Sequence, residues 1–253
     1  MRLKIAFALA FAACLVVAGG VYAADKCYDL VQAGHYDKAI VACDALIGGK
    51  VADKSVLATH YNNRGRAYGS LGKNDKAIAD FTKAIELDPK LARAYLYRGI
   101  VYKMTSKYDN ALADLNKAAS LNPKSAMTFF NLAEVYAAKG MSDKAIADYT
   151  KVIAIDPKRD IAYNNRGDIY MTKKKYAAAE KDIKKALEIN PGNMAAAVSL
   201  AEVYSGMKKT TDSCKWLNAG IEKGFKDWGY VKTSKSFDNI RPSECYKKIM
   251  AGK

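Results

Sequence analysis

The sequence predicts an all-α fold, a stack of similar helical hairpins, from three observations. Gly65 and Gly99 are separated by a fixed interval, and Gly167 follows Gly99 at twice that interval. The pentapeptide YNNRG at residues 61–65 recurs at residues 163–167. Four prolines close consecutive units of that same length, without an insertion: Pro89, Pro123, Pro157 and Pro191. A fixed period of about 34 residues is typical of repeat proteins, in which each unit contacts its neighbours, and not of a domain with one central pocket.

The N-terminal segment, residues 1–23, predicts an export signal. Arg2 and Lys4 precede an uncharged apolar run, and the small residues around Ala23 suit signal peptidase cleavage after that residue. Two alternatives stay open: a retained membrane anchor, and lipidation at Cys14, although the residues after Cys14 are apolar where a lipoprotein tether is polar. We therefore expect an exported protein, located in the periplasm or, as the second choice, secreted.

Each repeating unit predicts two helices. In the first full unit, residues 58–70 and 76–87 carry small and apolar residues at helical spacing, with a short connection between them. Pro89 ends the second helix, because proline cannot continue the backbone hydrogen bonding and disfavours a helical residue before it. Gly65 and Ala77 let the two helices approach closely, and Ala84 allows contact with the next unit.

This pattern of small, large and proline positions resembles the tetratricopeptide repeat. The resemblance covers residues 58–193 and implies a right-handed α-solenoid of four repeats. The positions that carry it are Tyr61, Gly65, Tyr68, Ala77, Phe81, Ala84 and Pro89; Tyr95, Gly99, Tyr102, Ala111, Leu115, Ala118 and Pro123; Phe129, Ala133, Tyr136, Ala145, Tyr149, Val152 and Pro157; and Tyr163, Gly167, Tyr170, Ala179, Ile183, Ala186 and Pro191. Val152 departs from the alanine of the family, which predicts looser stacking there.

Degenerate segments flank the four repeats. Residues 24–57 hold a degenerate helix pair and a linker, and residues 194–227 keep the repeat spacing without the closing proline. Residues 228–253 resemble the ending of many tetratricopeptide chains and predict a capping tail. Terminal units with a polar outer face keep an open stack from aggregating.

Removal of the signal leaves four cysteines, and an even number in an exported chain suggests disulfides. Cys27 and Cys43 lie on the two predicted helices of one hairpin, whereas Cys214 and Cys245 lie at the far end. We therefore predict the pairs Cys27–Cys43 and Cys214–Cys245. Buried free thiols are the alternative.

The residue inventory argues against catalysis, a cofactor and a metal. The two histidines, His35 and His60, lie on different units, and no His or Cys cluster has metal-ligand spacing. No glycine-rich phosphate loop follows a strand. The formal charge of +15 favours peripheral contact with an anionic envelope surface. The lysines are dispersed, without the interleaved aromatic residues of a basic stripe, so we predict no nucleic-acid partner.

Two charged positions recur with the repeat. Arginine precedes the glycine in three units, and an aspartate follows it at a constant spacing, as in Arg64–Asp80, Arg98–Asp114 and Arg166–Asp182. The spacing predicts ion pairs that fix the register of the two helices, with ligand binding by the arginines as the alternative. The third unit keeps Asp148 but has Leu132. Lysines near the end of the second helix predict a solvated surface, or alternatively a polyanion-binding ridge: Lys83, Lys117, Lys151 and Lys185.

The resemblance implies a concave groove, lined by the first helix of each repeat, that binds extended or helical peptides. Transferred to this chain, the groove residues are Asn62, Arg66, Arg93, Leu96, Ile100, Lys103, Phe130, Glu134, Asn164, Asp168 and Met171. Basic side chains come early and acidic ones late, including Glu202. This order suits a partner segment with an acidic end and a basic end, bridged by apolar residues. Ordinary exposed residues without a ligand are the alternative.

One family function is not implied. The repeats that clamp the C-terminal carboxylate of cytosolic chaperones need lysine and asparagine in the first unit and lysine and arginine in the third. The corresponding places here hold Asn62, Arg66, Met127 and Asn131.

The sequence therefore predicts a non-enzymatic adaptor of the cell envelope, with a protein or peptide partner held in the groove. The alternative is a basic surface protein that associates with anionic lipid or cell-wall polymer through its lysine-rich outer faces.

Overall fold

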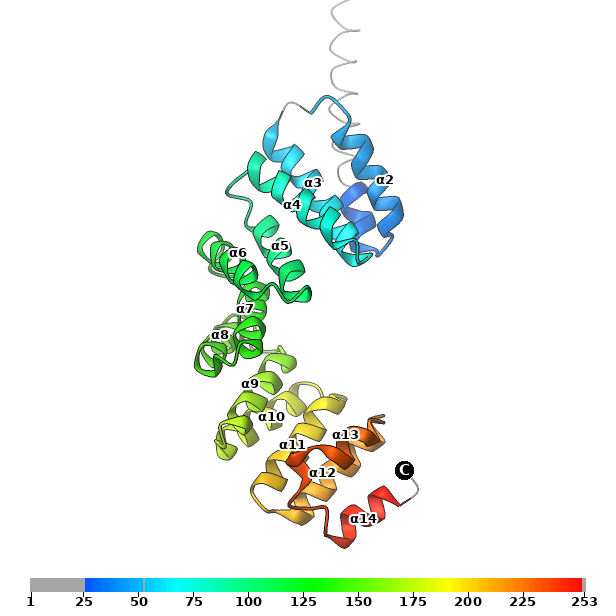
Figure 1. Ribbon diagram of the computed structural model, residues 1–253, viewed down its shortest axis with the longest axis vertical. Helices are drawn as coiled ribbons and strands as arrows, with labels where there is room; N and C mark the ends of the chain where they lie inside the picture. The colour runs from blue at the N-terminus through cyan, green and yellow to red at the C-terminus, as the bar shows by residue number, and fades with distance from the viewer. Residues whose placement is uncertain (1–25, 52, 252–253) are drawn as a thin grey trace, which may run out of the picture. The chain divides into compact units, whose positions relative to one another are not determined.

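The computed structural model describes residues 26–51 and 53–251, and these are helical with connecting turns (Figure 1). This confirms the predicted all-α class. The chain divides into two compact units: unit 1 ends at Pro123, and unit 2 begins at Lys124. No helix in the described ranges is long and apolar enough to cross a membrane. The expected export signal, residues 1–23, lies outside those ranges.

Unit 1 is built from helical hairpins. Its helices are α2 (Tyr36–Ile47), α3 (Lys54–Ser70), α4 (Asn74–Leu87), α5 (Ala92–Met104) and α6 (Tyr108–Leu121), after a helical stretch at residues 26–32. α3 pairs with α4 and α5 with α6, while α2 packs on α3 and α4 on α5. α3 begins earlier than the expected residue 58, because the Asp53 side chain caps it and accepts the backbone N–H of Ser55 at 2.7 Å.

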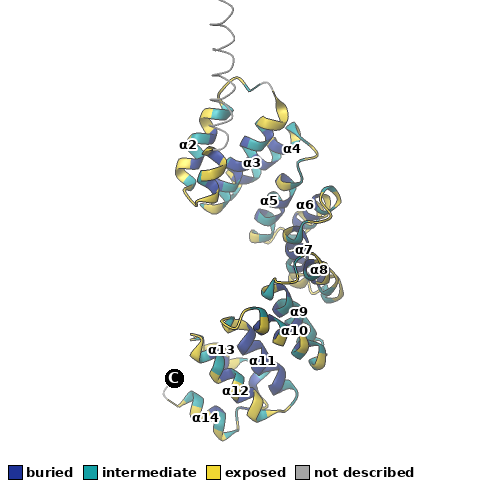
Figure 2. Cartoon of the chain, turned by 180° about the vertical axis from the view of Figure 1, so that it is seen from behind, coloured by how far each residue is buried: buried dark blue, intermediate teal, exposed yellow. Residues whose placement is uncertain are grey.

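Unit 2 continues the same pairing and adds a tail. Its elements are α7 (Ala126–Ala138), α8 (Ser142–Ile155), α9 (Asp160–Thr172), α10 (Tyr176–Ile189), α11 (Met194–Gly206), α12 (Thr210–Glu222), α13 (Trp228–Thr233), the 3₁₀ helix η1 (Lys235–Phe237) and α14 (Glu244–Met250). α11 contacts α9, α10, α12 and η1, so most of its residues are buried, as the dark blue of Figure 2 shows.

Glycine is needed where the two helices of a repeat approach closely. A Cβ atom on Gly65 would lie 2.9 Å from the Phe81 ring, and one on Gly99 would lie 2.9 Å from Leu115 Cγ. At Gly167 the distance to Ile183 Cγ1 would be 2.6 Å. Such distances are below ordinary van der Waals contact, which explains the glycine of the repeat.

The predicted arginine–aspartate pairs form in each of the three repeats that carry them. Arg64, Arg98 and Arg166 each donate two hydrogen bonds, of 2.7 to 2.9 Å, to the aspartate of the same repeat. Arg98 also donates to Thr82, and Arg166 to Thr150, on the second helix of the preceding repeat. These arginines therefore tie hairpins together within each unit. In the third repeat Leu132 is buried, and Asp148 pairs with Lys151 at 2.7 Å.

The recurring lysines are largely matched by acidic side chains on their own helices. Lys83 pairs with Glu86 at 3.0 Å, Lys151 with Asp148 as above, and Lys185 with Glu188 at 3.0 Å. The contacts of Lys83 and Lys185 join exposed side chains and are typical of a solvated helix face, whereas Asp148, the partner of Lys151, is only 5% exposed.

Both predicted disulfides are present. The Cα atoms of Cys27 and Cys43 are 5.4 Å apart, and those of Cys214 and Cys245 are 6.1 Å apart. In unit 2, Cys214 belongs to a buried cluster that joins α11 and α12 to the tail through Val231, Phe237 and Ile240. The tail thus packs on the last helical hairpin, as a capping segment does.

Candidate functional site

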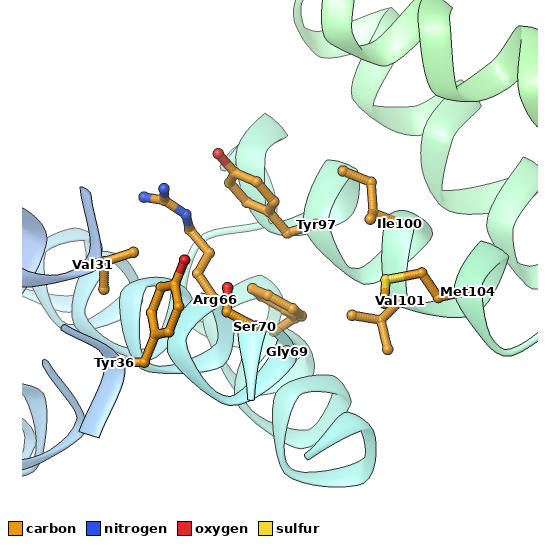
Figure 3. Close-up of a pocket in the computed structure, with 10 residues that line it drawn as sticks. Val31, Tyr36, Arg66, Gly69, Ser70, Tyr97, Ile100, Val101 and Met104 are labelled. Carbon is orange, nitrogen blue, oxygen red and sulfur yellow. The ribbon is translucent and has the colours of Figure 1, made fainter. Parts of the chain in front are cut away.

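Unit 1 contains a cavity of about 380 Å³ on the first helices of its repeats (Figure 3). α3 supplies Arg66 and Ser70, and α5 supplies Tyr97, Ile100 and Met104. The floor is formed by Phe81 and Val101, and the side towards the N-terminus by Val31 and Tyr36. The lining is mainly apolar, and 61% of Met104 is exposed to solvent at the rim. An apolar side chain from outside could therefore enter this cavity.

Arg66 is held by aromatic and amide contacts. Its Nη2 donates to Gln32 Oε1 at 2.8 Å, and its guanidinium carbon lies 4.8 Å from the centre of the Tyr97 ring. Figure 3 shows the guanidinium between the Tyr36 and Tyr97 side chains. In the part of the chain that the structure describes, no carboxylate pairs with Arg66, in contrast to Arg64 on the same helix. Its positive charge therefore remains uncompensated beside an apolar cavity.

The other predicted groove residues of unit 1 differ in exposure. Ile100 lines the cavity with Arg66, whereas Leu96 is almost fully buried. Asn62 is completely buried and donates to Asn63 at 3.4 Å, so its side chain is not on the surface. Arg93 is exposed at the start of α5, and Lys103 is half-buried near the end of the same helix.

Unit 2 places acidic side chains at one position of three successive repeats. Glu134 on α7, Asp168 on α9 and Glu202 on α11 recur at the repeat interval. Asn164 Nδ2 donates to Asp168 Oδ2 at 3.1 Å, and Asn164 is only 5% exposed. Burial raises the pKa of Asp168 to about 6, and the negative charge of Glu202 adds to the rise. We call Glu134, Asn164, Asp168 and Met171 the unit 2 face.

Aromatic residues surround this acidic position. Phe130 packs edge-on against Tyr149 with ring centres 5.6 Å apart, and the Arg159 guanidinium lies 4.8 Å from the centre of the Phe130 ring. Asn165 Nδ2 donates to the Tyr149 hydroxyl at 3.2 Å. Burial raises the pKa of Tyr149 to about 12, and the charges of Glu134 and Asp168 add to that rise. Both carboxylates therefore lie near one hydroxyl. Met171 packs against the cluster of α10 and α11.

The C-terminal tail covers Glu202, which the sequence placed at the acidic end of the groove. The Tyr230 hydroxyl of α13 donates to Glu202 Oε1 at 2.5 Å, and Glu202 is only 5% exposed. Burial raises the pKa of the Glu202 carboxyl, and hydrogen bonds from Tyr230, Ser236 and Ser234 offset part of that rise. Repeat spacing gives no signal for this contact, because the tail lies outside the periodic pattern.

Within residues 26–51 and 53–251, no three His, Cys, Asp or Glu side chains converge in a way that could hold a metal ion. The two faces offer charge, hydrogen bonding and apolar contact. Unit 1 offers a cation beside an apolar cavity, and unit 2 offers carboxylates beside aromatic rings.

Known proteins share this architecture. Models described as tetratricopeptide or TPR repeat match residues 65–106, 92–125, 126–159 and 161–193. A crystal structure of MamA superposes on this protein with a TM-score of 0.60 and 24% sequence identity. The match covers 63% of this chain and 93% of the MamA chain. YrrB, described as a TPR protein with an unusual peptide-binding site, is 21% identical over 66% of this chain and 86% of its own, with a TM-score of 0.59. PilF of Pseudomonas aeruginosa is 18% identical in sequence, with a TM-score of 0.62, and the match covers 78% of this chain and 97% of the PilF chain. No curated protein matches the chain.

Proposed function

Because the chain belongs to the tetratricopeptide repeat family, we propose that it is a non-enzymatic scaffold of the cell envelope that binds a segment of another protein on the first helices of its repeats. Stacked helical repeats present extended surfaces, which suit recognition of a chain segment better than chemistry at one point. The proposal therefore concerns binding and assembly, without turnover of a substrate.

The cavity of unit 1 carries this proposal. Its volume of about 380 Å³ lies at the lower end of ligand pockets, so it suits one large apolar side chain and not an extended cofactor. Arg66 stands at the cavity with no carboxylate partner among the described residues. A partner segment that places an apolar residue next to an acidic one would fill the cavity and compensate the charge.

The disulfides support the proposed location. Structural disulfides form and persist in oxidising compartments and are rare in the cytosol. Cys27–Cys43 and Cys214–Cys245 both have the Cα separation of a native disulfide. Together with the export signal expected at residues 1–23, they favour the periplasm, with secretion as the second choice.

The alternative function, association with anionic lipid or wall polymer, gains less support. It needs outer faces with uncompensated positive charge. Lys83, Lys151 and Lys185 instead pair with acidic side chains on their own helices, which lowers the net charge of that ridge.

Site-specific photocrosslinking in the native envelope tests the proposal. A benzophenone side chain at Met104, on the rim of the cavity, is expected to capture a defined protein, and Arg66→Gln is expected to reduce that capture at least severalfold. The matched control is Val56, which is 42% exposed in the same unit but does not line the cavity. Recovery of lipid or polysaccharide alone, or equal capture from Val56, would overturn the proposal.

A further inference from the structure

Asp168 differs from the four buried aspartates of the repeats in having no basic partner among the described residues. Asp80, Asp114 and Asp182 each accept two hydrogen bonds from an arginine, and Asp148 pairs with Lys151. Asp168 instead accepts a hydrogen bond from the neutral amide of Asn164 and has contact with the Ser199 hydroxyl. No Lys or Arg in the described ranges forms an ion pair with it. A carboxylate in this position is incompletely stabilised by the protein itself.

Two acceptor atoms at this point also have no donor. Asn164 Oδ1 and Asp168 Oδ1 are buried without a hydrogen-bond partner in residues 26–51 and 53–251. Asn164 is only 5% exposed and is anchored to Asp168 through its own Nδ2. Leaving such acceptors unpaired costs roughly 1–3 kcal/mol each, so the site favours a ligand that brings several donors. Asp168 as a residue is half-buried, so part of it reaches the surface, although Oδ1 itself is buried.

The charges around Asp168 specify the kind of donor. Glu134 and Glu202 occupy the same position in the repeats on either side; the negative charge of Glu134 acts on Tyr149, and that of Glu202 acts on Asp168. A neutral donor would satisfy the acceptors but leave the charge of Asp168 without a basic partner. A metal ion fits poorly, because no three acidic, His or Cys side chains of the described residues converge and Glu202 already accepts from Tyr230. An organic cation satisfies both requirements.

We propose that the unit 2 face binds a basic side chain of the partner protein, preferentially arginine, with its guanidinium against Asp168 and Asn164. This inference rests on the proposed scaffold function and specifies the partner's chemistry. Arginine is preferred over lysine because its fork of N–H donors can serve two neighbouring acceptors at once. The repeat gives unit 1 an unpaired cation and unit 2 an unpaired carboxylate, so the partner needs both acidic and basic residues.

Binding of the cation is expected to depend on pH. Asp168 lies near Tyr149 from α8, Glu202 from α11 and Tyr230 from α13. Burial and the negative charge of Glu202 raise the pKa of Asp168, and hydrogen bonds from Ser199 and Asn164 offset part of that rise. Deprotonation of Asp168 creates the charge that attracts the guanidinium. Affinity for an arginine peptide should therefore rise with pH through about 6 and level off above it.

The test uses the exported protein with both disulfides formed. The probes are the peptide Ac-Ala-Ala-Arg-Ala-Ala-NH₂ and its citrulline analogue, which has the same shape without the charge. At pH 7.5 we expect the arginine peptide to bind about tenfold more tightly and to shift the Asn164 side-chain amide signal in NMR spectra. Asp168→Asn should remove the preference. Glu188→Gln, which removes one negative charge from an exposed residue on α10, should retain it.

Several outcomes would overturn the inference: equal binding of the two peptides, no binding of either, or an unchanged preference in Asp168→Asn. The comparison of the two peptides on the unaltered protein needs no variant, so a folding defect in Asp168→Asn cannot obscure it. The Met104 crosslink reports the scaffold function independently through unit 1. A crosslinked partner without an arginine preference would leave the scaffold proposal standing and remove this inference alone.

Discussion

Unit 1 has Arg66 and Ile100 at the repeat position where unit 2 has Glu134, Asp168 and Glu202. In both units this position lies on the first helix of the repeat, within one turn of the residue at which the first and second helices approach closely. The side chains differ in charge and polarity, and so do their surroundings: an apolar cavity in unit 1, and in unit 2 aromatic rings beside a carboxylate that forms no ion pair among the described residues. The repeat fixes where the side chain lies and leaves its chemistry free to vary.

The charged residues that hold the hairpins together, called the framework, differ from those of the two faces in whether they have an oppositely charged partner. The framework arginines Arg64, Arg98 and Arg166 are all compensated by aspartates of the same repeat. Arg66 and Asp168, one on each face, have no oppositely charged partner among the described residues. Paired charges within the protein fix helix register, whereas unpaired charges at a surface are available to a partner.

The largest effect should come from removing the disulfide of each unit. Replacing Cys214 and Cys245 by alanine is expected to cost about 3.7 kcal/mol of unfolding free energy, and replacing Cys27 and Cys43 about 3.1 kcal/mol. The difference follows from the loop lengths, 31 and 16 residues, because the unfolded chain gains more entropy when a longer loop opens. Urea denaturation of the two variants measures both values. A greater loss for the pair in unit 1 would contradict this account.

A slightly smaller loss should follow from breaking a framework ion pair. Arg166→Met leaves Asp182 buried without its cation and should lower the free energy of unfolding by about 3 kcal/mol. The matched control is Lys83→Met, since Lys83 and its partner Glu86 are both exposed and water can replace the lysine at Glu86, so we expect a loss below about 1 kcal/mol.

The double variant Arg166→Met/Asp182→Leu sharpens this test. An apolar pair of similar size removes the buried charge as well as its partner, so most of the loss should be recovered. Additive losses in the double variant, measured by urea denaturation, would show that the arginine acts through something other than Asp182.

Much of this framework could be predicted from the sequence because it is periodic. The constant spacing of arginine and aspartate sets two side chains on facing helices of one hairpin, and the pairs form as expected. The cysteine pairs followed from the position of each pair within one end of the chain. Both predictions depend on local geometry, which the repeat determines.

Predictions about the faces were less complete, because exposure depends on tertiary packing. The repeat position of Asn62 predicts a place in the groove, yet its side chain is fully buried. Glu202 is covered by Tyr230, from a tail that has no repeat pattern. The lack of an oppositely charged partner for Arg66 and Asp168 is also a property of surroundings that periodicity does not reveal. The groove residues as a set stay a prediction.

The two units should respond to pH with opposite sign. His60 in unit 1 is buried, and burial lowers its pKa below the 6.5 of the unfolded chain, so unfolding takes up a proton and unit 1 loses stability as pH falls below 6.5. Asp168 in unit 2 has its pKa raised from 3.8 to about 6, so the folded form holds the proton and unit 2 loses stability as pH rises from about 4 to 6.

These opposite trends can be measured separately. Both tryptophans, Trp216 and Trp228, lie in unit 2, so tryptophan fluorescence follows the unfolding of that unit, and hydrogen exchange by mass spectrometry follows unit 1. Asp168→Asn should remove the loss in unit 2 and raise its stability at pH 7.5 by roughly 1–3 kcal/mol. A parallel pH response in both units would contradict the assignment to these two residues.

The smallest effect is expected at the outer lysines. Lys185 and Glu188 form an exposed pair one turn apart on α10, so Lys185→Gln should change the free energy of unfolding by less than about 0.5 kcal/mol. It should also leave protein capture at Met104 unchanged, whereas Arg66→Gln reduces it, although both substitutions remove one positive charge. If both variants instead lowered envelope association equally, net charge would govern binding. The protein would then act as a basic surface protein, and the contrast between its two faces would have no role in recognition.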